Sequence, residues 1–224
     1  MTASASIPLS VRLAYTFRDP ALRELALSHR SVGAHNNERM EFLGDALVNL
    51  FVAELLYERY PKADEGELTR MRSRLVSEPA LAHQARDLEL GDQLHLGTGE
   101  LKSGGFRRDS ILADAFEALV AAIYLDGGWA SCRDEIRALF DEAITHVSPD
   151  DGKDPKTRLQ ELLQARGLAL PVYELAGSSG ADHAKIFDVQ CVIEPLQLRC
   201  DGRGSSRRAA EQAAALEAIA QVQV

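Results

Sequence analysis

Apolar residues recur at the spacing of an α-helix through the first two thirds of this chain, and that regularity limits its fold more than any other feature. The same region contains no convincing alternation of apolar and polar residues, which a half-buried strand would require. The runs with helical spacing lie at residues 9–17, 20–29, 37–58, 65–74, 78–89, 110–125 and 130–146. The spacing therefore predicts an all-α domain at residues 1–147.

The pattern changes after a short polar segment that contains proline and glycine, and we predict that this segment, residues 148–153, is a linker. A helical pattern follows at residues 154–166. Runs typical of strands come next, at 172–176, 187–193 and 196–200, followed by a Gly-rich turn and an Ala-rich helix at 206–222. The order α-β-β-β-α predicts a second, α+β domain at residues 154–224.

The charge of the chain is unevenly distributed between the two predicted domains. The net charge is −9, and residues 154–224, with eight basic and nine acidic side chains, contribute only −1 of it. Overall charge bears on solubility and non-specific attraction, not on one particular site. The acidity of the first domain therefore does not exclude a nucleic-acid partner. Such a partner can still bind if metal ions neutralise any cluster of carboxylates in this domain and basic residues gather elsewhere.

Three further features indicate a cytoplasmic protein with no membrane partner. No apolar run approaches the ~18 residues that span a bilayer, and the N-terminus lacks the basic start and apolar stretch of a secretion signal. The cysteines, Cys132, Cys191 and Cys200, show neither CxxC spacing nor an obvious pairing. This favours reduced, buried cysteines over a disulfide or zinc framework.

Three acidic residues share one narrow face of the predicted helix at residues 37–58. At 100° per residue, Glu38, Glu41 and Asp45 lie within about 60° of one another. The opposite face, which is expected to meet the core, carries the apolar residues Met40, Leu43, Leu47, Leu50 and Phe51. A solvated acidic face is the ordinary explanation for a single helix of this kind.

A second helix strengthens the case for a metal site. Asp114 and Glu117 stack on one face of the predicted helix at residues 110–125. If the two helices lie side by side, these acids can cluster with Glu41 and Asp45. Like charges that close cannot all stay ionised without a cation, and oxygen ligands without His or Cys favour Mg²⁺ or Mn²⁺ over zinc. Such a site would activate water for a phosphodiester displacement, although the spacing alone does not show that the helices meet.

Two residues of the helix at 37–58 do not fit simple core packing. Gly44 in a helix interior costs ~1 kcal/mol relative to Ala, so we expect another part of the chain to pack closely against its backbone. Phe42 lies beside the acids and away from the core stripe. Incidental exposure is one explanation, and the alternative hypothesis is that Phe42 is buried in a homodimer interface.

Three segments, in order, resemble the ribonuclease III family. Residues 36–47 read NNERMEFLGDAL, residues 64–75 read DEGELTRMRSRL, and residues 110–119 read SILADAFEAL. A single acidic helix is weak support, whereas three blocks in the right order and spacing are specific. The resemblance covers approximately residues 9–222.

The resemblance implies a homodimeric endonuclease that cuts double-stranded RNA with Mg²⁺, for which Mn²⁺ can substitute. By the family's pattern, Glu41, Asp45, Asp114 and Glu117 bind the metal, and Asp45 and Glu117 are the most directly catalytic. Glu38 and Glu65 match positions for substrate handling, although Glu65 is equally explained as an acid in a first helical turn. The implied products carry 5′-phosphate and 3′-hydroxyl ends with short 3′ overhangs, from ribosomal, messenger and transfer RNA precursors.

Between the second and third blocks lies a Gly-rich basic segment, residues 97–108. It lacks the GxxxxGK[ST] order of a P-loop. We predict a surface loop, whose Lys102, Arg107 and Arg108 can meet phosphates near the site.

The α-β-β-β-α order of the C-terminal domain is typical of a double-stranded-RNA-binding domain. Such domains read A-form RNA across two minor grooves and the phosphates between them. Our candidate RNA-binding residues are polar groups of the first helix, a loop histidine and two arginines where the last helix begins: Thr157, Gln160, Glu161, Gln164, His183, Arg207 and Arg208. Each of these residues can also be an ordinary surface residue with no role in RNA binding, because loop histidines and arginines at helix starts are commonly only solvated.

The chain departs from the family's pattern in the C-terminal domain. Gly180 and Ala181 stand where the family often has Gly-Pro, and Arg207 and Arg208 stand where paired lysines are common. The first change loosens the loop, whereas the second keeps the charge. The competing hypothesis, a non-catalytic double-stranded-RNA-binding protein, would be marked by a missing metal carboxylate, and all four are present.

Overall fold

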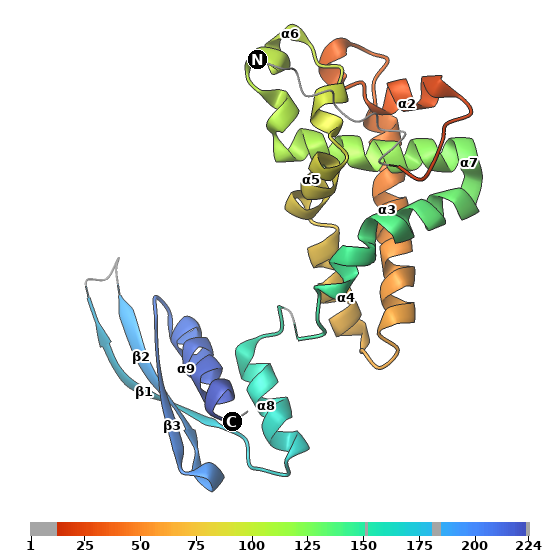
Figure 1. Ribbon diagram of the computed structural model, residues 1–224. Coiled ribbons are helices and arrows are strands. Elements are labelled where there is room, and N and C mark those ends of the chain that lie inside the picture. The colour runs from red at the N-terminus through yellow and green to blue at the C-terminus, as the bar shows by residue number, and fades with distance from the viewer. Residues whose placement is uncertain (1–12, 151, 181–184, 223–224) are drawn as a thin grey trace, which may run out of the picture. The chain divides into compact units, whose positions relative to one another are not determined.

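The computed structural model describes residues 13–150, 152–180 and 185–222. The chain divides into two compact units, residues 1–151 and 152–224, and each is considered by itself (Figure 1). None of the helices in these described ranges combines the length and apolar character needed to cross a bilayer.

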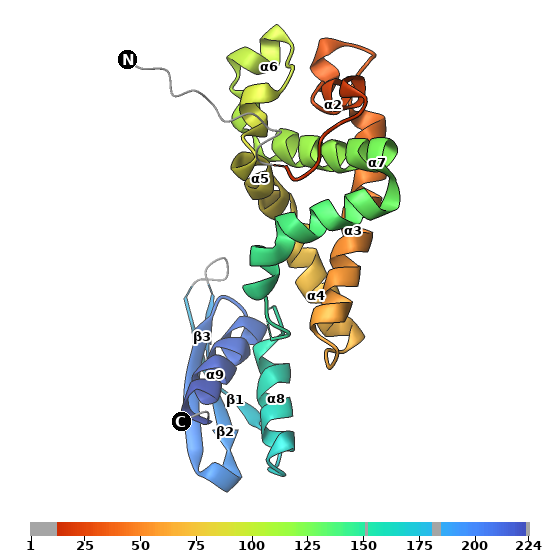
Figure 2. The same cartoon turned by 45° about the vertical axis from the view of Figure 1, so that its right-hand side comes forward.

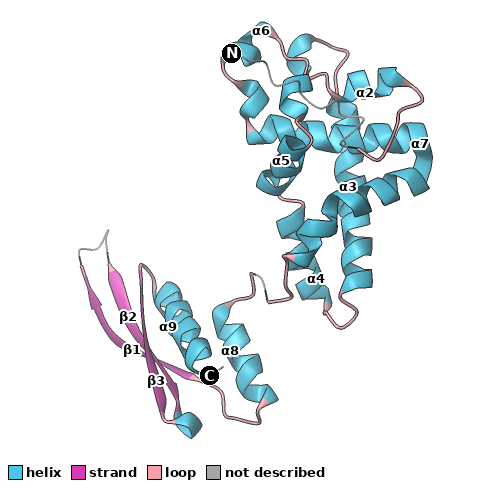
Figure 3. Ribbon diagram, viewed as in Figure 1, coloured by secondary structure: helices cyan, strands magenta, loops and turns pink. Residues whose placement is uncertain are grey.

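The elements of the first unit in its described part are helices and short 3₁₀ turns, and the predicted all-α class is confirmed (Figure 3). Its α-helices are α2 (Pro20–Ala26), α3 (Glu38–Arg59), α4 (Glu65–Leu75), α5 (Glu78–Asp87), α6 (Thr98–Lys102) and α7 (Asp109–Thr145). Short 3₁₀ turns occur at Arg30–Val32, Leu90–Gln93 and Gly105–Arg107. The Gly-rich segment expected to be a loop thus contains the short helix α6 and one 3₁₀ turn.

The predicted helix at residues 9–17 is wrong in its described part. Residues 13–17 contain no helix, and residues 9–12 lie outside the described part of the chain. Leu13, Tyr15 and Phe17 turn toward the core while the residues between them are exposed. This is the two-residue period of an extended segment, which a short apolar run does not distinguish reliably from a helix.

The core of the first unit forms where α3 and α7 cross, as Figures 1 and 2 show. Phe51 of α3 and Phe116 of α7 are fully buried there, and α5 packs against α7 from another side. Phe140, near the end of α7, contacts Phe116 edge-on with ring centroids 6.1 Å apart. The two ends of α7 therefore contribute to one continuous core.

The helix α7 bends at Gly128, where we predicted a gap between two helices. Gly128 has φ 77° and ψ −172°, a conformation open essentially only to glycine. Just before the bend, the Asp126 carboxylate accepts hydrogen bonds from the Tyr15 hydroxyl (2.5 Å) and the Arg18 backbone N–H (2.7 Å). The bend is thus fixed to the segment that precedes α2.

Local signals in the sequence explain where α2 and α4 begin. The Asp19 carboxylate accepts a hydrogen bond from the Ala21 N–H, and Pro20 occupies the first helical position. In α4, Asp64 and Glu67 form a reciprocal capping box in which each side chain accepts the other residue's backbone N–H. The box fixes the orientation of the first turn of α4, where Glu65 lies.

The second unit is a three-stranded antiparallel sheet with two helices, in the predicted α-β-β-β-α order (Figure 3). Its strands lie in the order β1 (Val172–Ser179), β2 (Ile186–Ile193), β3 (Leu198–Gly204). The helices α8 (Pro155–Ala165) and α9 (Arg207–Val222) pack together, and α9 also packs on β2 and β3.

The glycines expected to form a turn before the last helix lie instead in β3. A Cβ added to Gly202 would come within 2.2 Å of the Ala210 carbonyl oxygen and the Ala214 nitrogen of α9. The glycines and the alanine-rich face of α9 therefore allow the helix and the strand to approach closely. Because this reason is tertiary, the local turn signal of the sequence was misleading.

Candidate metal centre

Three carboxylates from two helices meet in the first unit. Glu41 lies in the first turn of α3, and Asp114 and Glu117 lie three residues apart on α7. One ligand oxygen from each lies within 4.8 Å of the other two, and all three side chains are partly buried. The spacing of the acids did not show whether the two helices meet, and the structure shows that they do. We call these three residues the carboxylate cluster.

The close approach of the two helices depends on Gly44. A Cβ built on Gly44 would lie 1.8 Å from the backbone carbonyl oxygen of Glu117, a distance that real atoms do not adopt. The expectation that something packs tightly against this glycine is therefore confirmed. The contact sets α3 against α7 one turn along the helix from Glu41.

Asp45 lies at the margin of the carboxylate cluster. Its carboxylate accepts a hydrogen bond from the Asn49 amide at 2.9 Å, one turn later on α3, and Asp45 is exposed. It is not among the three residues whose oxygens come within 4.8 Å of one another. Its negative charge nevertheless acts on Glu117.

Ionisation of the carboxylate cluster is unfavourable without a cation. Burial, and then the charges of Asp45, Asp114 and Glu41, raise the pKa of Glu117 to about 8. Burial is also the main cause that raises the pKa values of Glu41 and Asp114. A divalent cation would remove this repulsion, and the all-oxygen donor set fits a hard ion such as Mg²⁺ or Mn²⁺.

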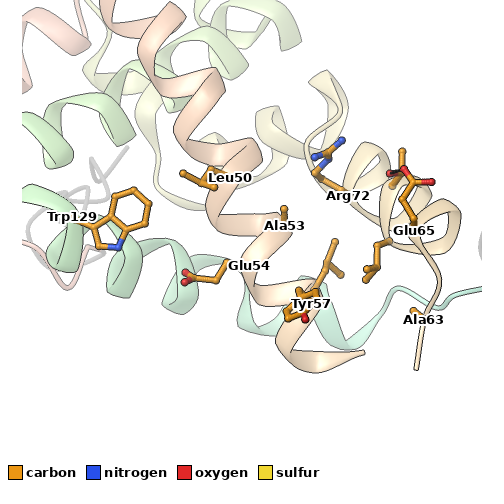
Figure 4. Close-up of a pocket in the computed structure, with 11 residues that line it drawn as sticks. Leu50, Ala53, Glu54, Tyr57, Ala63, Glu65, Arg72 and Trp129 are labelled. Atoms are coloured by element: carbon orange, nitrogen blue, oxygen red, sulfur yellow. Dashed lines mark hydrogen bonds between the residues drawn. The ribbon is translucent and has the colours of Figure 1, made fainter. Parts of the chain in front are cut away.

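The two acids expected beside the site lie in different places. Glu38 lines a polar pocket next to the carboxylate cluster, and its carboxylate is 3.9 Å from the Arg30 guanidinium. Glu65 lies in the first turn of α4, where its carboxylate accepts the Thr69 hydroxyl at 3.1 Å. In this chain Glu65 lines a groove between α3 and α4 (Figure 4).

The groove between α3 and α4 is rich in exposed apolar side chains. Leu50 and Tyr57 of α3 are 47% and 74% exposed, and Trp129 of α7 borders the same groove with 48% exposed (Figure 4). Phe42, one of the earlier residues of α3, is 82% exposed. We call these four exposed residues, three from α3 and Trp129 from α7, the α3 apolar surface.

The candidate RNA-binding residues of the second unit are exposed wherever the structure describes them. The four polar candidates of α8 share its solvent-facing side, whereas Leu159 and Leu163 are fully buried. Arg207 and Arg208 form the first turn of α9, and their guanidinium groups contact Glu211 (3.0 Å) and Asp154 (3.3 Å). His183 lies outside the described residues.

Two families of known proteins match the chain over separate segments. The family described as Ribonuclease-III-like matches residues 19–143, and the family described as Double-stranded RNA binding motif matches residues 155–222. The first match contains the whole carboxylate cluster, and the second contains α8, the sheet and α9.

Individual relatives agree with these matches. A protein named Ribonuclease 3 from Xylella fastidiosa (strain M23) is 56% identical over 225 residues, covering 99% of this chain and 98% of the relative. The solved nuclease domain of ribonuclease III from Campylobacter jejuni superposes with a TM-score of 0.59 at 38% identity, covering 62% of this chain and 96% of that one. A second structure of that domain describes flexibility in a region involved in dimer formation; its TM-score is 0.58 at 39% identity, with coverage of 60% and 94%.

Proposed function

This chain belongs to the ribonuclease III family, and from its carboxylate cluster we propose that it hydrolyses the phosphodiester bonds of double-stranded RNA with a divalent cation, Mg²⁺ in the cell. The chain is an endoribonuclease with a double-stranded-RNA-binding motif. The convergence of Glu41, Asp114 and Glu117 is the observation that carries the proposal of metal catalysis.

We assign the ligand roles to the four carboxylates identified in the sequence. Glu41, Asp114 and Glu117 would hold the cation directly, and Asp45 would join them after its side chain leaves the Asn49 amide. The bound cation supplies an activated water and neutralises charge on the phosphate. Glu117, the acid whose pKa is raised to about 8, would exchange its proton for the cation.

We propose that the working form is a homodimer in which each site cuts one strand. The α3 apolar surface supports this assignment, because it places exposed aromatic side chains on the helix that carries Glu41. The nuclease domain from Campylobacter jejuni has a region involved in dimer formation. Two sites acting on opposite strands would leave 5′-phosphate and 3′-hydroxyl ends with short 3′ overhangs.

The second unit would hold the duplex for cleavage. We place the nuclease domain at residues 1–147 and the RNA-binding domain at 154–224, joined by the linker at 148–153. Exposed α8 side chains would reach 2′-hydroxyls, and Arg207 and Arg208 would contact phosphates at the start of α9. Structured precursors of ribosomal, messenger and transfer RNA in the cytoplasm are the expected substrates.

A cleavage assay on a long RNA duplex, with and without Mg²⁺, tests the proposal. Wild type is expected to cut only with the metal. The Glu117→Gln variant keeps the side-chain shape but loses the anionic ligand, so it should bind the duplex without cutting it. Wild type that binds the duplex but never cuts it would instead support a non-catalytic RNA-binding protein, and undiminished cutting by the variant would show that the site is elsewhere.

A further inference from the structure

A second, polar pocket lies directly beside the carboxylate cluster. Glu41 and Asp114 of the cluster form part of its wall, and the rest includes His29, Arg30 and Arg108. A ligand in this polar pocket would therefore be adjacent to any cation that the cluster holds. The basic residues come from two separate segments, one before α3 and one at the start of α7.

His29 offers the polar pocket a hydrogen-bond donor. Its side chain is only 8% exposed, and its Nδ1 accepts the backbone N–H of Ser31 at 3.2 Å. A ring nitrogen that accepts an N–H carries no proton, so the neutral imidazole carries its proton on Nε2. No hydrogen bond from that Nε2–H is found within the described part of the chain, although the ring interacts electrostatically with Asp114, which lines the same pocket.

The start of α7 adds further donors to the polar pocket. Ser110 in the first turn of α7 lines the pocket, and no side chain among the described residues caps this end of the helix. The uncapped N–H groups and the helix dipole favour an anion here. Arg108, the residue before α7, also lines the pocket, and its guanidinium lies 3.2 Å from Glu100. Five N–H groups on each guanidinium leave donors for a second acceptor.

The charge balance of the polar pocket sets a condition on binding. The acids that line it, Glu38, Glu41, Glu100 and Asp114, outnumber the two arginines. We therefore expect an anion to bind only after a divalent cation occupies the carboxylate cluster. Forked guanidinium groups, a helix N-terminus and an imidazole N–H together match a phosphate group.

We propose that the polar pocket binds a phosphate group that neighbours the scissile phosphate on the same RNA strand, once a divalent cation occupies the carboxylate cluster. This inference rests on the proposed function. It assigns Arg108 and His29 to substrate binding, and it separates Arg108 from its neighbour Arg107. The Arg107 guanidinium lies over the Phe106 ring, 5.0 Å from its centroid, and does not line the pocket.

The experiment measures binding of inorganic phosphate to the full chain by calorimetry in the presence of Mg²⁺. Wild type and Arg107→Ala are expected to bind with equal affinity, and neither should bind without Mg²⁺. Arg108→Ala is expected to bind about tenfold more weakly, which corresponds to about 1.4 kcal/mol. Equal affinity of Arg108→Ala and wild type would overturn the inference, because the phosphate would then be held by the metal alone.

A double variant removes the main ambiguity, since loss of Arg108 also leaves Glu100 without that partner. Arg108→Ala combined with Glu100→Gln is expected to stay weak, and full recovery of phosphate affinity would overturn a direct role for Arg108. Duplex cleavage by wild type then distinguishes two failures. If wild type cuts RNA but phosphate affinity does not depend on Arg108, only the pocket assignment fails. If phosphate affinity depends on Arg108 but no RNA is cut, the proposed function fails.

Discussion

The α-carbon of Gly44 on α3 faces the backbone carbonyl of Glu117 on α7 so closely that a methyl group between them would lie 1.8 Å from the carbonyl oxygen. One glycine thus sets how near the two carboxylate-bearing helices can come. The contact involves the backbone of a proposed metal ligand, so its effect reaches the geometry of the carboxylate cluster directly.

Replacing Gly44 by alanine is expected to force α3 and α7 apart. Overpacking of this kind costs typically about 1–3 kcal/mol, so the midpoint of denaturant unfolding should fall and Mg²⁺ affinity should weaken with it. The matched control is Gly99→Ala in α6, because a Cβ there meets nothing within 4 Å. A Gly44→Ala protein with wild-type stability and Mg²⁺ affinity would show that the helices adjust without cost.

The pH dependence of stability should carry a signature of Glu117. Its pKa in the folded protein is about 8, above the ordinary value of about 4.3. Between these two values the folded protein binds more protons at this group than the unfolded chain, so its contribution to the free energy of unfolding falls as pH rises. Metal-free Glu117→Gln should therefore be more stable than wild type at pH 8, with the difference shrinking toward pH 5.

Thermal melts with a chelator measure this difference, and about 1 kcal/mol moves the melting temperature of a protein this size by roughly 2–4 °C. Glu142→Gln, an exposed acid on α7, serves as the control and should show no such trend. Adding Mg²⁺ should stabilise wild type more at pH 8 than at pH 6, because a smaller fraction of Glu117 is protonated at pH 8 and the cation displaces fewer protons. A constant difference between wild type and Glu117→Gln across this pH range would contradict the raised pKa.

Phe42→Glu is expected to weaken the proposed homodimer. Phe42 is 82% exposed in the single chain, so its replacement should cost little in folding, whereas a buried charge at an interface is strongly unfavourable. Analytical ultracentrifugation should show monomers at concentrations where wild type is dimeric. Glu142→Gln again gives a surface control, and a fully dimeric Phe42→Glu protein would exclude Phe42 from the interface.

Arg207→Ala and Arg208→Ala should weaken duplex binding without regard to sequence. Each lost phosphate contact is expected to reduce the slope of log affinity against log salt by about 1. The control is Arg199→Ala, because Arg199 alternates with the buried Cys200 on β3 and so lies on the sheet face away from α9. Binding measured without divalent metal, so that nothing is cut, should separate these variants. Equal salt slopes for all three would remove the two arginines from the RNA interface.

Much of the carboxylate cluster could be predicted because its determinants are periodic. Acids at helical spacing opposite an apolar face identify which side chains share a surface, and Gly44 in a helix interior indicated a close neighbour. Sequence order alone did not show that α3 and α7 meet at Glu41 and Glu117. That contact depends on tertiary packing, and the three family blocks were needed to predict it.

The polar pocket could not be predicted in the same way. His29 and Arg108 come from irregular segments far apart in the chain, and no spacing rule connects them. The Gly-rich basic segment indicated phosphates in general, but it did not distinguish Arg108 from Arg107. The predictions of a helix at Leu13 and of a turn at Gly202 were wrong for a related reason, because contacts with distant elements determine the conformation of both segments.

The route of the chain through the first unit has a consequence for its synthesis. Glu41 lies early in that unit, whereas Asp114 and Glu117 follow only after α4, α5 and α6, and the last part of α7 completes the same core. Chains emerge from the ribosome N-terminal end first. A partly made chain, surrounded by the structured RNA of the ribosome that produces it, therefore has no assembled carboxylate cluster until the first part of α7 has emerged.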